Sequence, residues 1–226
     1  MIILESKRNA AMIQRKYPNA LVKDMSERHK LSPFYSHEGI RVPFTDGYTG
    51  VSVAAIWNSL MVFEDADVDM ELRNIRIHTL GRKHVGNFVG IRQGYFNNCI
   101  MDVVEARKKI LKPMYRWMLE QKVFPIVQQL RETAKQRDII LLDDSMNSDI
   151  GNVNQPLSQA WLLKSYVEGL YPYEDVYEIK HVYQNITVGQ HSYYRKTDLK
   201  VLKKIAPHCC NKQLKIGFDH NNSVFE

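Results

Sequence analysis

The segment from Ile100 to Gln121 is the feature that most constrains the fold, because a set of mainly apolar side chains recurs in it at helical spacing. Pro113 falls inside this pattern and predicts a kink, or two helices that meet there. A second helical segment over 124–136 carries Pro125 at a tolerated early position. The recurring positions of the first segment are Val103 or Val104, Arg107, Ile110 or Leu111, Met114 and Met118.

Shorter elements are expected in the rest of the chain. Because strands and helices do not alternate regularly, nothing indicates a doubly wound sheet. We therefore predict an α+β fold that is mainly helical, compact over residues 1–170 and accompanied by a few short strands. The expected elements are a helix over 7–17 and strands over 1–4, 20–22 and 138–144.

Composition places the chain among ordinary soluble proteins. Of 226 residues, 44% are apolar and 25% charged, and no apolar run approaches the length that spans a membrane. Three cysteines, two of them adjacent, make no disulfide framework, so we expect a cytoplasmic protein in a reducing cytosol. Walker A, GxGxxG, GxSxG and HExxH patterns are all missing from the sequence. We therefore expect no cofactor and no metal, and any chemistry must come from scattered polar residues.

Positive charge gathers near the C-terminus. Residues 180–216 hold eight Lys or Arg and one acid, a net of +7, while the whole chain carries +6. Tyrosines interleaved with these cations can stack on bases while lysines hold phosphates, which favours DNA or RNA as a partner of Lys200, Lys203 and Lys204. Tyr-rich strands with lysines for solubility explain the same letters. We expect residues 171–226 to form a basic extension packed on the domain.

The stretch 31–63 predicts a pocket. Tyr35 and His37 follow a Pro-aromatic turn, glycines 39, 47 and 50 make a permissive loop, and Ser52 is suited to begin a helix that reaches Phe63. Helical spacing puts Trp57 on the buried face of that helix, with Asn58 one step round it. A loop feeding a helix N-terminus suits an anion such as phosphate. A surface loop that merely caps a core helix fits the same residues.

Two further segments carry polar residues that suit a site. Residues 72–83 end in Gly81-Arg82, where Arg82 is either an anion ligand or the cationic last turn of a helix stopped by glycine. After the strand at 138–144, Asn147 and Asp149 crowd a loop before Pro156, which we expect to begin another helix.

The order of these motifs resembles the NADAR domains over roughly residues 31–170. The motifs are the Phe34-Tyr35-Ser36 turn, the helix from Ser52 to Phe63, Leu80-Gly81-Arg82, the long helical middle, Asn147-Ser148-Asp149 and the helix led by Leu157. The resemblance is nearest to a divergent, partly phage-borne branch, so host cytoplasm is the expected location. It implies an N-glycosidase that removes ADP-ribose from nucleobases, or another protein that acts on an ADP-ribose-like or nucleotide ligand.

The departures from the NADAR pattern concern its reactive residues. The Glu and Lys of the family helix are Ala54 and Met61 here, and basic positions around the final helix are Gln155 and Gln159. Glycosidic cleavage needs a carboxylate beside the sugar, which neither Ala nor Met supplies.

Two hypotheses follow from what the chain keeps and what it lacks. One is a hydrolase that uses Asp149 as acid/base and Arg82 on phosphates. The other is a catalytically degenerate domain that binds nucleotide or nucleic acid as a decoy, sensor or inhibitor. Both place one set of ligand-binding residues, with Asp149, in one cleft: Tyr35, His37, Ser52, Trp57, Asn58, Arg82 and Asn147.

Overall fold

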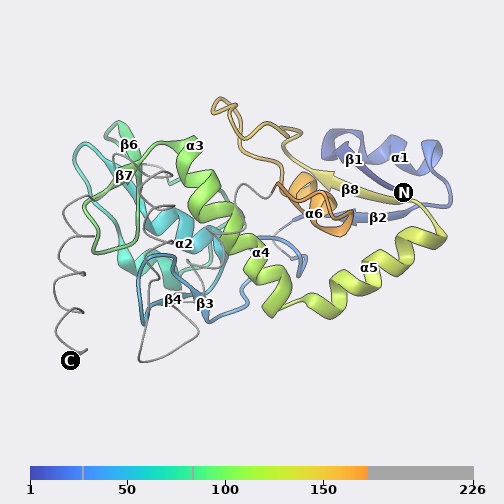
Figure 1. Ribbon diagram of the computed structural model, residues 1–226. Coiled ribbons are helices and arrows are strands. Elements are labelled where there is room, and N and C mark those ends of the chain that lie inside the picture. The colour runs from blue at the N-terminus through green and yellow to red at the C-terminus, as the bar shows by residue number, and fades with distance from the viewer. Residues whose placement is uncertain (27, 83, 173–226) are drawn as a thin grey trace, which may run out of the picture.

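The computed structural model describes residues 1–26, 28–82 and 84–172. Among these residues about 37% are helical and about 17% lie in strands, so the fold is mixed α and β with helix in excess. Figure 1 shows a molecule with two halves that the helix α4 (Lys112–Gln121) connects. The basic segment 180–216, including Lys200, Lys203 and Lys204, lies outside the described residues.

The first half, called the sheet half below, is built on three parallel strands. These are β1 (Ile2–Ser6), β2 (Leu21–Asp24) and β8 (Ile139–Asp143), in the order β1-β8-β2. β8 is buried at all five positions because it has a neighbour on both sides, Ile139 pairing with Ile2 and Leu21. The helices α1 (Ala10–Lys16), α5 (Phe124–Gln136) and α6 (Gln159–Val167) belong to this half (Figure 1).

The predictions for the sheet half are mostly confirmed. Strands form at the three expected places, and the helix over 124–136 has the predicted bounds. Pro156, however, does not begin the last helix. That helix starts at Gln159 after Ser158, whose hydroxyl accepts a hydrogen bond from the Trp161 N–H at 3.1 Å. A serine at the Ncap accepts a hydrogen bond from a free N–H of the first helical turn. The helix therefore begins directly after Ser158, not at Pro156, two residues before this cap.

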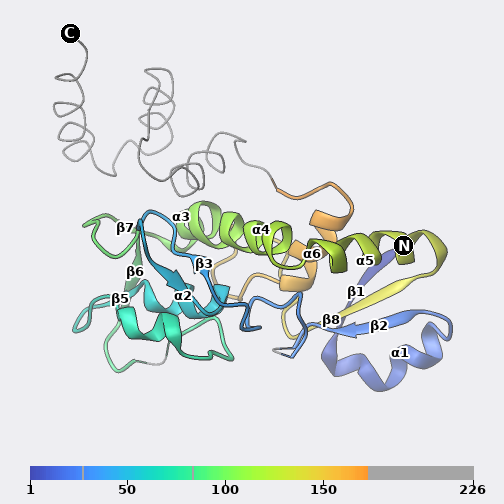
Figure 2. The same cartoon turned by 90° about the horizontal axis from the view of Figure 1, so that it is seen from below.

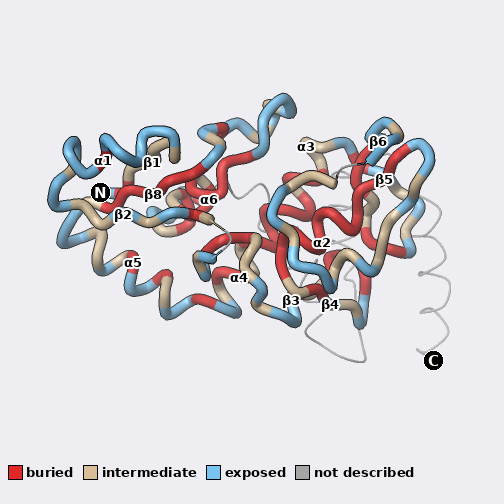
Figure 3. Tube along the Cα trace, turned by 180° about the vertical axis from the view of Figure 1, so that it is seen from behind, coloured by how far each residue is buried: buried red, intermediate tan, exposed pale blue. Residues whose placement is uncertain are grey.

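The second half, called the cavity half, surrounds the short helix α2 (Val53–Ser59). An antiparallel sheet β5 (Met61–Phe63), β6 (Phe88–Arg92) and β7 (Ile100–Met101) lies in this half, as does the hairpin β3 (Ile40–Arg41) and β4 (Thr49–Gly50). All seven residues of α2 are buried, and Figure 3 shows α2 as buried throughout, whereas α1 is mostly exposed and α5 mixes buried and exposed positions.

Two predictions for the cavity half are wrong. The helix from Ser52 ends at Ser59 instead of Phe63, because Met61 and Val62 pair with Ile91 and Gly90 as a strand. Of residues 72–82, only those in the 3₁₀ turn Met70–Asn74 are helical, so the helix that Gly81 would stop does not form. The segment after this turn bonds to another element instead, the Thr79 carbonyl oxygen accepting from Asn58 Nδ2 at 2.9 Å.

The long periodic segment is one continuous helical stretch with a change of pitch. α3 (Val103–Ala106) leads into a π-helical turn at Arg107–Leu111 and then into α4, as Figures 1 and 2 show. Pro113 has no N–H to offer to the preceding turn, which accounts for the local change from α to π hydrogen bonding. The predicted irregularity at Pro113 therefore lies in the turn that precedes it.

One large apolar cluster joins the two halves. It contains Ile2 and Leu141 from the sheet half, Ile56 from α2, and Tyr115 from α4. Tyr171 also packs into it, and its hydroxyl donates to the Lys112 carbonyl oxygen at 2.8 Å. Among the described residues, no helix is long and apolar enough to cross a membrane.

Candidate functional site

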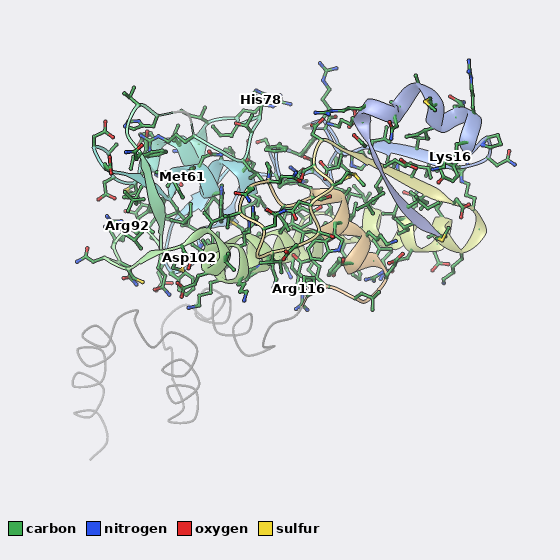
Figure 4. All side chains as sticks on the ribbon, turned by 90° about the horizontal axis from the view of Figure 1, so that it is seen from above. Lys16, Met61, His78, Arg92, Asp102 and Arg116 are labelled. Carbon is green, nitrogen blue, oxygen red and sulfur yellow. The ribbon has the colours of Figure 1, made fainter. Side chains whose placement is uncertain are left out.

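A cavity of about 220 Å³ lies between α2, the β5–β6 strands, the π turn and the loop that follows β8. Trp57 and Phe88 supply aromatic faces, while Arg107, Asn154 and Gln155 are its polar residues. In Figure 4 the labelled Met61 lies in the cavity half, far from Lys16 in the sheet half. The remaining lining residues are apolar: Met61, Leu80, Ile91, Val103, Leu111, Val153, Pro156 and Leu157.

Arg107 holds one wall of this cavity in place. Its side chain leaves the π turn and is buried, with the residue only 4% exposed. Nη1 donates to the carbonyl oxygens of Ile150 and Asn152 at 2.9 and 2.7 Å, and Nη2 donates to that of Gln155 at 2.7 Å. Burial lowers the pKa of the guanidinium, and the Asp149 carboxylate acts against this shift. A buried cation satisfied by three carbonyls fixes a loop that has no regular structure of its own.

Asn147 supports the same wall from within the loop. Its Nδ2 donates to the carbonyl oxygens of Asn152 and Gln155, each at 3.1 Å, and its Oδ1 accepts from the Asp149 N–H at 2.9 Å. The predicted ligand-binding role of Asn147 therefore has a structural alternative, because all of these partners are backbone groups. Asp149 itself is exposed, and its Oδ1 accepts from the Gly151 N–H at 2.8 Å.

Of the eight predicted site residues, Trp57 is the one that lines the cavity. Asn58 and Arg82 contact residues at or beside the lining. Asn58 Nδ2 donates to the Thr79 carbonyl oxygen at 2.9 Å, next to Leu80, and the Arg82 N–H donates to Met61 Sδ at 3.3 Å. Both side chains also keep a buried polar atom, Asn58 Oδ1 and Arg82 Nη1, without a hydrogen-bond partner among the described residues.

The other three predicted residues surround the N-terminus of α2. The ring of Tyr35 lies 4.8 Å from that of His37, and His37 Nε2 lies 2.7 Å from the Lys30 carbonyl oxygen. Burial lowers the pKa of His37. Ser52 caps α2 by accepting from the Ala55 N–H at 3.0 Å. None of these side chains belongs to the described lining of the cavity.

At the N-terminus of α2, where an anion site is one of two interpretations, protein groups occupy at least two of the free donors. The Ala54 N–H donates to the Pro33 carbonyl oxygen at 3.0 Å, and the Ala55 N–H is taken by Ser52. A Cβ at Gly50 would lie 2.5 Å from the Ile56 side chain. This glycine therefore allows the loop to approach its own helix closely. The structure favours the loop that caps a core helix over the phosphate cradle.

The sequence matches the model of a family of unknown function (DUF6939) over residues 5–163 of 226. The chain belongs to this family. No curated protein and no solved structure matches it. Every residue that lines the cavity falls inside the stretch matched to DUF6939, whereas the basic C-terminal segment falls beyond it. The resemblance to NADAR domains stays a prediction.

The sequence alone does not indicate Arg107 as a residue of the cavity in this DUF6939 protein. Arg107 stood in the helical series of 100–121, but its carbonyl partners lie 43 to 48 residues further along, so no local pattern indicates them. Met61 and Gln155 were noticed as departures from the NADAR pattern, and both line the cavity. Within the described part of the chain, no group of three His, Cys, Asp or Glu side chains is placed to hold a metal ion.

Proposed function

We propose that the protein binds an ADP-ribose-type ligand, as the NADAR resemblance suggests, by taking the ligand's flat ring into the cavity. A volume of about 220 Å³ is below the ~300–1,000 Å³ of pockets for drug-sized ligands, so a base or a nicotinamide ring is the part that would enter. The Trp57 and Phe88 side chains offer aromatic surface to such a ring. The nucleotide's sugar and phosphates would remain outside.

The observation that carries this proposal is that two of the four NADAR departures fall in the cavity lining, while Ala54 and Gln159 lie outside it. Met61 and Gln155 stand at positions where that family has Lys and a basic residue, and both line this cavity. The resemblance and the geometry thus point to the same place, although they are independent. The two side chains leave the lining apolar or neutral there, which suits ring binding better than charge-dependent chemistry.

The residues that line the cavity favour binding of the ligand without its cleavage. A glycosidase needs a carboxylate beside the sugar. The described lining of the cavity contains none, and Asp149 is exposed on a neighbouring loop. Asp149 lies close enough to affect the pKa of Arg107, which does line the cavity. Hydrolysis by Asp149 is therefore the second candidate function.

Calorimetric titration with ADP-ribose tests the proposal. A ligand at 100 times its Kd adds about 2.7 kcal/mol to the free energy of unfolding, which a melting curve detects. Val153→Trp should abolish binding, since Val153 lines the cavity yet is 53% exposed, so the new ring fills the cavity without entering the core. Val22→Trp is the matched control, because Val22 is 42% exposed and lies on β2 in the sheet half, away from the lining.

Turnover separates the two candidate functions. The wild-type protein is incubated with NAD or ADP-ribosylated DNA, and released ADP-ribose is measured by chromatography. We expect no release. Release that Asp149→Asn abolishes would establish the hydrolase instead, and ADP-ribose binding that Val153→Trp leaves intact would overturn the cavity as the site.

A further inference from the structure

The acidic run 64–71 faces basic side chains of the segment that ends in β6. Asp65 Oδ1 lies 2.8 Å from His84 Nε2, and Asp69 Oδ2 lies 3.9 Å from Arg82 Nη2. Asp67 forms a third pair, its Oδ1 lying 2.6 Å from Arg92 Nη2. The sequence predicts a solvated connection or a first helical turn for such a run. In the structure, three of its five acids instead pair with side chains of one segment.

Two of these three pairs meet at the ring of Phe63. The Arg82 guanidinium carbon lies 5.4 Å from the ring centroid, and the His84 ring lies 4.7 Å from it. Phe63 in turn contacts Phe88 edge to face, with ring centroids 5.9 Å apart, and Phe88 lines the cavity. A chain of direct contacts therefore leads from Arg82 and His84 to the cavity wall. Arg92 has no part in it, and Figure 4 shows Arg92 at the outer end of the cavity half.

The pairing of Arg82 is incomplete. At 3.9 Å its contact with Asp69 is longer than a hydrogen bond, and Nη1 is buried with no acceptor among the described residues. The Asp69 side chain is 39% exposed, whereas that of Arg82 is 17% exposed. Asp69 Oδ1 accepts from the Glu71 N–H at 3.2 Å, so Oδ2 is the atom that a ligand can replace while the guanidinium stays against Phe63. Arginine prefers a partner with two parallel acceptors, which a phosphate provides.

We propose that Arg82 and His84 form a phosphate subsite beside the cavity, and that Asp69 and Asp65 occupy it until a ligand arrives. The subsite rests on the proposed function, since the phosphates of an ADP-ribose-type ligand would reach it from a ring held in the cavity. The chain's own carboxylates then compete with the ligand, and their removal strengthens binding of anions. Asp67 is not a competitor, because its partner is Arg92.

Titration of three probes against four proteins tests the subsite. The probes are ADP-ribose, adenosine and inorganic pyrophosphate, and the proteins are wild type, Arg82→Gln, Asp69→Asn and the matched control Asp67→Asn. Wild type should bind ADP-ribose at least about tenfold more tightly than adenosine, through charge-assisted hydrogen bonds to phosphate. Arg82→Gln should lose this difference. Asp69→Asn should tighten ADP-ribose and pyrophosphate about two- to fivefold and leave adenosine unchanged.

The outcomes separate the subsite from the cavity. Adenosine that binds in a Val153-dependent manner, together with no effect of Arg82→Gln or Asp69→Asn on ADP-ribose, would overturn the subsite and keep the proposed function. If pyrophosphate binding depends on Arg82 but no ligand binds in a Val153-dependent manner, the proposed function is overturned and the subsite is kept. If Asp67→Asn tightened ADP-ribose binding as much as Asp69→Asn, the lower negative charge alone would explain the gain in affinity. That result would also overturn the subsite.

Discussion

In the sheet half, the buried carboxylate of Asp143 accepts hydrogen bonds from Ser158 Oγ, the Ala160 N–H and the Asp144 N–H at 2.8 to 2.9 Å. In the cavity half, Asn58, Arg82 and Arg92 each keep a buried polar atom with no partner among the described residues, whereas Gln159 is the one such residue in the described sheet half. A folded protein normally satisfies such atoms, because each orphan costs about 1–3 kcal/mol. The contrast indicates that the sheet half is arranged for stability, while the cavity half retains polar capacity for something else.

Arg107 lines the cavity and is also a buried cation that donates to three carbonyl oxygens. We therefore expect its removal to have the largest effect on stability. Arg107→Ala removes the donor of the Ile150 carbonyl oxygen, one of two donors to the Asn152 and Gln155 carbonyl oxygens, and a large buried side chain. We expect the free energy of unfolding to fall by about 3–5 kcal/mol. Urea denaturation measures this loss. Lys135→Ala, which breaks an exposed pair with Glu132, should cost about 0.5 kcal/mol or less. Equal losses of unfolding free energy in the two variants would mean that the hydrogen bonds from Arg107 do not stabilise the loop.

The sheet half offers the second test. Asp143→Ala removes the common acceptor of three donors at the start of α6, so we expect a loss of about 2–3 kcal/mol in urea denaturation. Asp144→Ala is the neighbouring control, because its carboxylate is 81% exposed and pairs only with Lys7 among the described residues. A loss in Asp143→Ala no greater than in this control would remove the stability role assigned to the sheet half.

These energies explain which parts of the fold the sequence could predict. The helix over 124–136 depends on contacts three and four residues apart, so its period alone was sufficient. β5 was taken for the end of a helix because its pairing with β6 joins residues almost thirty positions apart. The segment after Asn74 differs from the expected helix for a related reason: it bonds to Asn58 and Met61, and helical periodicity does not reveal these contacts.

The candidate site was less predictable than the fold. Trp57 could be identified as buried from helical spacing, although that spacing says nothing about a cavity beside it. Ser52 is predicted to bind a ligand because it begins a helix, but its hydroxyl accepts from the Ala55 N–H of that helix. Met61 stood out only by comparison with the NADAR pattern. Arg107 and Asn147 build one wall from different elements of the chain, so no fixed sequence spacing indicates them.

Acid should reveal a smaller difference through His37, near the start of α2. Burial lowers its pKa below the ordinary value of about 6.5, so the unfolded chain binds the proton more readily. The stability that this group contributes is present above pH 6.5 and is lost as the pH falls toward the folded pKa. In His37→Gln the free energy of unfolding should therefore depend less steeply on pH, by a slope that corresponds to a fraction of one proton. Urea denaturation between pH 7 and pH 5 measures this slope.

His29 provides the comparison for that experiment. Its pKa is also lowered by burial, so His29→Gln should flatten the same pH window in the same direction. The two groups titrate separately, and the double variant should therefore be flatter than either single variant. A His37→Gln protein as steep as wild type would contradict the assignment of acid sensitivity to the N-terminus of α2.

The smallest expected effect on stability belongs to Arg82, and it is the sharpest test of the contrast. Arg82→Gln breaks a long ion pair with Asp69 and a contact with the Phe63 ring, which together favour the folded state modestly. It also removes a buried Nη1 that has no acceptor among the described residues, which favours the variant. We expect these contributions to cancel within about 0.5 kcal/mol in urea denaturation, while phosphate-dependent binding is lost. A loss above about 1.5 kcal/mol, as for a satisfied buried charge, would place Arg82 with Asp143 among the residues that serve stability.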